Sequence, residues 1–211
     1  MTLQEAIMRH RLENDSADFS ANFNLGALLL SRKEIPAAME YLRRALRSRP
    51  EQPSALNSMG VALESDGRFD EAVQQFRHAL GALPDYTDAR YNLANALAAQ
   101  GKMEEAAENF RLVLAASPGD TGAREHLAVA LTQLGDSAAS SGRFAAAADS
   151  YRELVGLEPG NADYHNNYGI VLVRSGNLAG AIEQFQAALK VDPGHRAARR
   201  NLDLAEKRLH P

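Results

Sequence analysis

Apolar residues recur along this chain at steps of three and four, with polar residues between them. Such spacing places the apolar side chains on one face of an α-helix, where they form a single buried stripe. In five places a small residue is also followed, four positions later, by a large apolar one. These pairs are Ala38 and Leu42, Ala72 and Phe76, Ala106 and Phe110, Ala147 and Tyr151, and Ala181 and Phe185. The pattern predicts an all-α chain of short amphipathic helices.

Prolines and glycines show that this helical pattern is periodic. The prolines Pro50, Pro84, Pro118, Pro159 and Pro193 are spaced by 34, 34, 41 and 34 residues, and the glycines Gly67, Gly101, Gly142 and Gly176 by 34, 41 and 34. Proline cannot continue a helix, so each proline marks the exit of a second helix. Each glycine falls where a tight turn joins the two helices of a pair. Self-similarity at this period is typical of a solenoid.

A Leu-Gly step in the first helix of each block completes the signature. It stands as Leu25-Gly26, Met59-Gly60, Leu93-Ala94, Leu134-Gly135 and Tyr168-Gly169. With the pairs and prolines above, the blocks resemble tetratricopeptide repeats, which are 34-residue helix–turn–helix units. The family's tryptophan is absent; Asn22, Leu56, Arg90, Leu131 and His165 occupy its column. The resemblance implies a right-handed superhelical α-solenoid of five repeats, at 19–52, 53–86, 87–120, 121–161 and 162–195.

The segments outside the repeats also have a helical pattern. Residues 1–18 include an amphipathic stretch from Leu3 to Leu12, which we expect to pack on the first repeat. Residues 196–211 alternate apolar and charged residues and read as the capping helix that a solenoid end requires. This tail has a charge balance of +3, and basic residues there either attract an anionic partner or form a solvated outer face. No linker separates the repeats, so we expect one continuous domain.

The fourth repeat is seven residues too long. Both Leu127-Ala128 and Leu134-Gly135 fit the Leu-Gly step, and seven residues is nearly two helical turns. We predict one long first helix from about Asp120 to about Ser141. The competing interpretation is a helix that ends near Gly135, with residues 136–141 as a loop. A protruding helix end would be a partner contact or a neutral insertion.

The resemblance also implies a binding groove, because first helices line the concave surface in this family. The column before the Leu-Gly step reads Asn24, Ser58, Asn92, Gln133 and Asn167, with His126 replacing Gln133 in the other register. Side-chain amides can pair with the N–H and C=O of an extended peptide. This column resembles the asparagine ladder in the repeats of O-linked N-acetylglucosamine transferase. The alternative is that these amides only stabilise local packing.

Neighbouring columns add further candidate groove residues. These are Asn57, Tyr91, Asn95, Asn166 and Arg174, and Tyr91 and Asn95 share one helix face with Asn92 beside them. The two-carboxylate clamp of heat-shock chaperone adaptors needs a basic pair on its third first helix. That pair is absent here, so we do not expect recognition of an acidic C-terminal tail.

Composition excludes several classes of protein. The absence of cysteine excludes disulfide scaffolds, thiolate zinc sites and cysteine nucleophiles, and a net charge of −4 argues against a general nucleic-acid binder. No phosphate-binding loop or HExxH motif is present, the six histidines are scattered, and Asp163 with His165 reads as a solvated polar pair. We therefore expect no catalytic residue, metal site or cofactor. There is no apolar run of about 20 residues and no signal-peptide pattern. A cytoplasmic location is expected, or a periplasmic one if a signal peptide has been removed.

These observations predict a non-catalytic scaffold that binds a partner protein or an extended peptide in its groove. One alternative is the repeat region of a larger enzyme, or an accessory subunit to one, such as a glycosyltransferase. Another is a self-assembling homo-oligomer. On the groove hypothesis, replacing Asn92 and Asn167 by alanine should weaken partner binding and leave thermal stability nearly unchanged.

Overall fold

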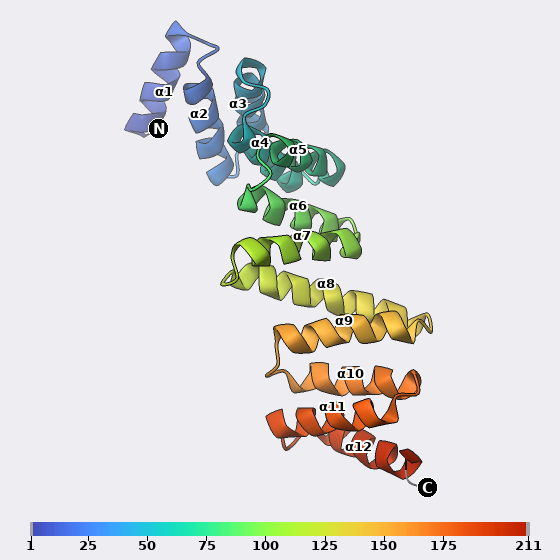
Figure 1. The fold of residues 1–211 in the computed structure, drawn as a ribbon. Coiled ribbons are helices and arrows are strands. Elements are labelled where there is room, and N and C mark those ends of the chain that lie inside the picture. Colours follow the sequence, from blue (N-terminus) through green and yellow to red (C-terminus); the bar gives the residue numbers. More distant parts are fainter. Residues whose placement is uncertain (1, 210–211) are drawn as a thin grey trace. The chain divides into compact units, whose positions relative to one another are not determined.

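The computed structural model describes residues 2–209, and within them the chain is entirely α-helical. The helices are α1 (Leu3–Asn14), α2 (Phe19–Ser31), α3 (Ile35–Ser48), α4 (Pro53–Ser65), α5 (Phe69–Ala82), α6 (Thr87–Ala99), α7 (Met103–Ala116), α8 (Thr121–Ser140), α9 (Phe144–Leu157), α10 (Ala162–Arg174), α11 (Leu178–Val191) and α12 (Arg196–Leu209) (Figure 1). The prediction of an all-α chain of repeated helix pairs is confirmed.

The helices form two compact units, one ending at Ala123 and the other beginning at Arg124. In the first unit α2 packs on α3, α4 on α5 and α6 on α7, and each pair contacts the next. In the second unit α10 packs on α9 and α11, and α12 covers α11. The boundary falls inside α8, whereas the sequence indicated one continuous stack. The exact limits of the five repeats remain our proposal.

Backbone geometry explains where each pair turns. Gly67, Gly101, Gly142 and Gly176 have φ values between 73° and 87°, which is the left-handed region that glycine enters without strain. The predicted tight turn at these glycines is confirmed, and its backbone is left-handed. In the first repeat Lys33 stands at the same place with φ 61°, although it is not a glycine.

The Leu-Gly step is where the two helices of a pair approach most closely. A Cβ atom added at Gly60 would lie 2.4 Å from Cε1 of Phe76, and one at Gly169 would lie 2.5 Å from Cε1 of Phe185. Both rings are fully buried. In these two pairs the glycine of the first helix therefore makes room for the aromatic ring of the second.

The long first helix of the fourth repeat is continuous. It has 20 residues where α10 has 13, and it runs through Ser140, so the interpretation of residues 136–141 as a loop is wrong. A Cβ atom at Gly135 would lie 2.9 Å from Cε2 of Tyr151. Leu134-Gly135 is therefore the step that packs on α9, and the seven extra residues lie in α8 before it. The Tyr151 hydroxyl donates to Asp136, and burial together with this carboxylate raises the pKa of Tyr151.

The N-terminal helix α1 is held against α2 by apolar contacts and by one buried carboxylate. Met8 and Leu12 pack on the core around Leu25 and Leu29. Glu5 is 5% exposed and accepts hydrogen bonds from Arg9 at 3.0 Å and from Arg32 at 2.9 Å. The Arg32 side chain, which donates from the C-terminal end of α2, is the main cause that lowers the pKa of Glu5 to about 2, with Arg9 adding to it.

We expect docking of α1 to weaken as the pH falls from about 4.5 towards 2. Because the folded pKa of Glu5 lies below its ordinary value of 4.5, its stabilising contribution is complete above that value and is lost as the carboxylate protonates. Amide exchange of α1, measured between pH 6 and pH 2, should show this loss in the wild type and a reduced loss in Glu5→Gln. Glu13→Gln is the control, because Glu13 is exposed and its one side-chain partner among residues 2–209 is His10. An unchanged pH dependence in Glu5→Gln would refute the role of Glu5.

Candidate functional site

The predicted groove residues lie on the first helices, and we call the surface that these helices form in each unit the first-helix face of that unit. It is formed by α2, α4 and α6 in the first unit, and by α10, α12 and the part of α8 after Ala123 in the second. Neighbouring residues on the same helices, such as Leu25, Leu56 and Leu93, are buried against the second helices. Asn24, Gln133 and Arg174 are exposed, Asn57, Ser58, Tyr91, Asn92, Asn95 and Asn167 are half-buried, and Asn166 is buried.

In the first unit, three of these residues come together at one pocket. Asn92 of α6 donates from Nδ2 to Oδ1 of Asn57 on α4 over 3.0 Å. These two amides and Tyr91 line a pocket of about 340 Å³. The Tyr91 ring packs edge-on against the Phe110 ring, with ring centroids 5.8 Å apart. This contact fixes the orientation of the Tyr91 side chain.

Sequence reasoning missed three other residues that line this pocket, Thr87, Asp88 and Asp120. Asp88 could have been found, because it lies one helical turn before Asn92. Asp120 could not, since it precedes α8 and its position depends on the preceding turn. Its Oδ1 accepts from the backbone N–H of Ala123 at 2.9 Å, which caps α8. Two carboxylates and two amides make the pocket rich in acceptors, so it suits a ligand that presents N–H donors.

In the second unit two consecutive hydrogen bonds join the groove amides. Asn201 of α12 donates from Nδ2 to Oδ1 of Asn166 over 3.0 Å, and Asn166 donates to Asn167 over 3.3 Å. Asn201 follows Asn167 by 34 residues and therefore continues the predicted column. The amide bridge between consecutive first helices thus occurs in both units, once between α4 and α6 and once between α10 and α12.

These bridges divide the amides of the predicted groove into two classes. Asn57, Asn92 and Asn166 have amide partners on a neighbouring first helix and contribute to packing between helices, and Asn167 accepts from Asn166 on its own helix. Asn24, Asn95 and Gln133 make no side-chain hydrogen bond within residues 2–209 and keep their amides available. The structure therefore changes one expectation: Asn92→Ala should cost about 0.5–1.5 kcal/mol of stability, because it breaks the bond to Asn57.

The residues near His165 do not form a ligand site. His165 is buried and contacts Gln184 at 2.9 Å and the carbonyl oxygen of Pro159 at 3.1 Å. Asp163 instead contacts His195 at 3.0 Å. Within the described part of the chain no group of three or more His, Asp and Glu side chains could hold a metal ion.

Comparison with known proteins decides the family. A model of the tetratricopeptide repeat matches residues 3–53, 57–121, 132–197 and 169–206. The chain belongs to the tetratricopeptide repeat (TPR) family. No curated protein sequence matches it. Among the residues that the structure describes, no helix of this TPR chain is long and apolar enough to cross a membrane.

Several solved TPR structures are similar to this one. A TPR repeats protein from Bacteroides fragilis is 14% identical, with a TM-score of 0.68 over 91% of this chain and 99% of that one. YrrB, described as a TPR protein with an unusual peptide-binding site, is 22% identical, with a TM-score of 0.62 over 92% and 96%. The first TPR of Spaghetti (RPAP3), bound to the HSP90 peptide SRMEEVD, is 21% identical, with a TM-score of 0.55 over 57% and 95%. At these identities the likeness shows the fold.

Proposed function

We propose that this TPR chain is a non-catalytic scaffold that binds an extended segment of a partner protein along its first-helix face. TPR proteins are in general protein-interaction scaffolds, and YrrB and the RPAP3 repeat are described with a peptide-binding site and a bound peptide. The observation that carries the proposal for this chain is the polar pocket of Asn57, Tyr91 and Asn92, together with the amides of Asn24 and Asn95, which have no side-chain partner within residues 2–209.

The roles of the amides follow from their partners. The Asn57–Asn92 bridge holds α4 and α6 in register and forms one wall of the pocket. Asn24 on α2 and Asn95 on α6 offer both a donor and an acceptor, which is what the backbone of an extended peptide requires. In this proposal the paired amides shape the surface and the unpaired ones contact the ligand.

This division gives a sharper test than alanine at Asn92 and Asn167. The double variant Asn24→Ala/Asn95→Ala removes two amides without breaking a hydrogen bond within residues 2–209. We expect partner binding to weaken about tenfold and the midpoint of thermal unfolding to stay unchanged. Capture of partners from a lysate, followed by titration of the captured segment as a synthetic peptide, measures the binding.

The matched control is Gln74→Ala, which removes an exposed amide from α5, a second helix outside the first-helix face. It should bind the same segment as tightly as the wild type. If the double variant and the control bind that segment equally well, the unpaired amides do not contact the ligand and this proposal fails.

A further inference from the structure

A separate pocket lies in the second unit between α10 and α12. It has a volume of about 170 Å³, and its apolar lining includes Ile170, Val173, Phe185 and Leu204. Phe185 is 1% exposed and forms the floor, whereas Ile170 and Leu204 are 38% and 55% exposed. A cavity of about 150 Å³ holds a benzene ring, so this pocket has room for one large apolar side chain.

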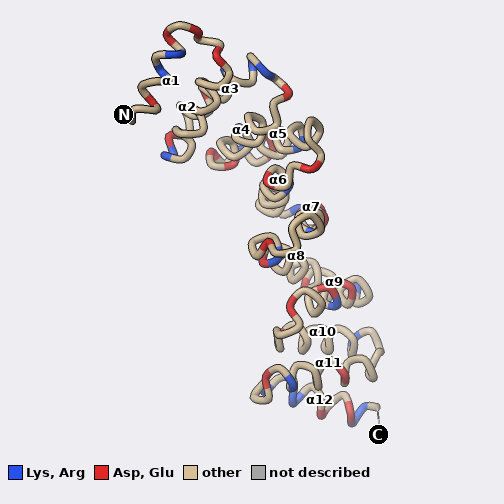
Figure 2. Tube along the Cα trace, turned by 60° about the vertical axis from the view of Figure 1, so that its left-hand side comes forward, with Lys and Arg blue, Asp and Glu red and all other residues tan. Residues whose placement is uncertain are grey.

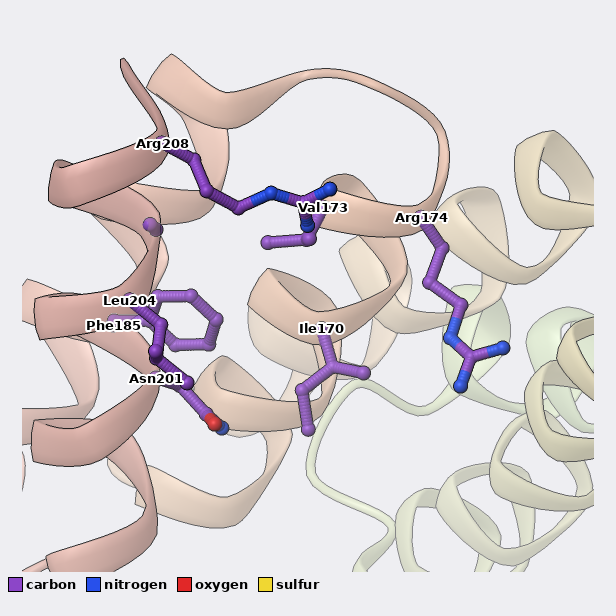
Figure 3. A pocket seen from close by; sticks show the side chains of 8 residues that line it. Ile170, Val173, Arg174, Phe185, Asn201, Leu204 and Arg208 are labelled. Atoms are coloured by element: carbon purple, nitrogen blue, oxygen red, sulfur yellow. The ribbon is translucent and has the colours of Figure 1, made fainter. Parts of the chain in front are cut away.

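Two arginines border this apolar lining, Arg174 of α10 and Arg208 of α12. Figure 3 shows the guanidinium of Arg208 lying beside Val173, while Arg174 lies on the far side of Ile170 and points away from Phe185. The guanidinium carbon of Arg174 lies 5.9 Å from the ring centroid of Phe144. Neither arginine forms an ion pair with a carboxylate in the part of the chain that the structure describes. Two positive charges thus border an apolar pocket, and among the described residues neither has a carboxylate partner.

The repeat itself supplies a comparison for these arginines. Ile170 and Leu204 are 34 residues apart, as are Arg174 and Arg208, so consecutive first helices repeat the same pair. In the first unit Ala27 and Val61 hold the apolar positions of this column and line a pocket between α2 and α4. The arginine positions there are Ser31 and Ser65, which line the same pocket. The fold therefore does not require arginine at these positions.

The helix α12 is also the most basic element of its unit. It carries Arg196, Arg199, Arg200, Lys207 and Arg208 against Asp203 and Glu206 (Figure 2). Guanidinium groups bind carboxylates through paired hydrogen bonds, and they do so most strongly next to apolar surface that excludes water. Arg200 does not line the apolar pocket; it lines a neighbouring pocket that shares Leu204 with it.

We propose that this pocket binds a linear segment of a partner protein in which one large apolar side chain is flanked on both sides by acidic residues. The apolar side chain enters between Ile170 and Leu204, and the flanking carboxylates meet Arg174 and Arg208. The two guanidinium groups lie on different sides of the apolar lining, so one carboxylate at a chain end would meet only one of them. This inference rests on the proposed function, since each site uses the first-helix face of its own unit.

Fluorescence anisotropy with a defined probe tests this inference. The probe is the peptide Ser-Asp-Glu-Leu-Asp-Glu-Ser-amide with tetramethylrhodamine, which has no net charge, coupled to its N-terminal amine, so that neither end of the peptide is charged. We expect saturable binding that weakens about tenfold when leucine is replaced by serine, and about tenfold when the acids are replaced by their amides. Arg174→Gln/Arg208→Gln should lose about tenfold for the acidic probe and very little for the amide probe.

Arg200→Gln is the matched control, because it removes one positive charge from α12 outside the pocket. Equal losses in Arg200→Gln and Arg208→Gln would mean unspecific attraction and would overturn the proposal, as would no anisotropy change at up to about 1 mM protein. Equal affinity for the leucine and serine probes would exclude the apolar pocket. Failure of this probe, while partner capture still depends on Asn24 and Asn95, would refute this inference and leave the proposed function standing.

Discussion

Replacing Gly60 by alanine is expected to lower the free energy of unfolding by about 2–3 kcal/mol, although alanine is the better helix former by about 1 kcal/mol. The new methyl group would lie 2.4, 2.7 and 2.8 Å from three ring atoms of Phe76. Phe76 is fully buried, so its ring cannot turn away into solvent. The two helices α4 and α5 must separate, which loosens the core around them. Chemical denaturation monitored by circular dichroism measures the change.

The same chain contains the control for this substitution. Gly81 lies in α5, and a methyl group there would meet no atom within 4 Å. Gly81→Ala should therefore stabilise the protein by about 0.5–1 kcal/mol through helix propensity alone. If Gly60→Ala is as stable as the wild type, the close approach of α4 and α5 does not constrain that position.

The close contact between Gly60 and Phe76 also illustrates why the fold could be predicted from the sequence. The small residue at the Leu-Gly step, which is glycine in four repeats and Ala94 in the third, the alanine in the second helix and the proline at its exit each have a local cause. These causes are close approach, a buried stripe and chain termination. These causes act within about 34 residues and repeat five times, so each repeat supports the assignment of the others.

The sequence could not decide which of the two candidate steps in α8 packs on α9, because both fit the same apolar stripe. Leu127-Ala128 and Leu134-Gly135 are seven residues apart, and nearly two full helical turns separate them, so the periodicity is the same for both. Only the position of Tyr151 decides, since its ring lies against Gly135. The sequence also does not predict where the chain divides into two units, because contacts between helices depend on how neighbouring pairs pack.

The candidate site shows a similar limit. The column of amides is visible in the sequence because it follows the repeat. Whether an amide is paired depends on the distance between consecutive first helices, and the sequence does not encode that distance locally. Asn92 and Asn95 are neighbours on one helix, yet Asn92 bridges to Asn57 and Asn95 has no such bond within residues 2–209. The sequence could therefore name the column but could not separate its packing members from its ligand-binding candidates.

A double-mutant cycle at the second amide bridge tests this separation. Asn166→Ala is expected to lower the free energy of unfolding by about 1–3 kcal/mol, because Asn166 is 6% exposed and its loss leaves the half-buried Asn201 amide without its acceptor. Asn201→Ala should have a smaller effect, since Asn166 keeps its bond to Asn167. Urea denaturation of both single variants and the double variant measures the coupling.

We expect the double variant to lose about 0.5–1.5 kcal/mol less than the sum of the two single variants, which is the energy of one buried amide pair. Asn24→Ala is the reference, because its exposed amide has no partner within the described residues and should change stability by less than about 0.5 kcal/mol. Strict additivity would mean that the bridge does not couple α10 to α12. In that case the paired amides would no longer be set apart from the unpaired ones. Asn166 and Asn24 would then both be candidates for contact with a ligand.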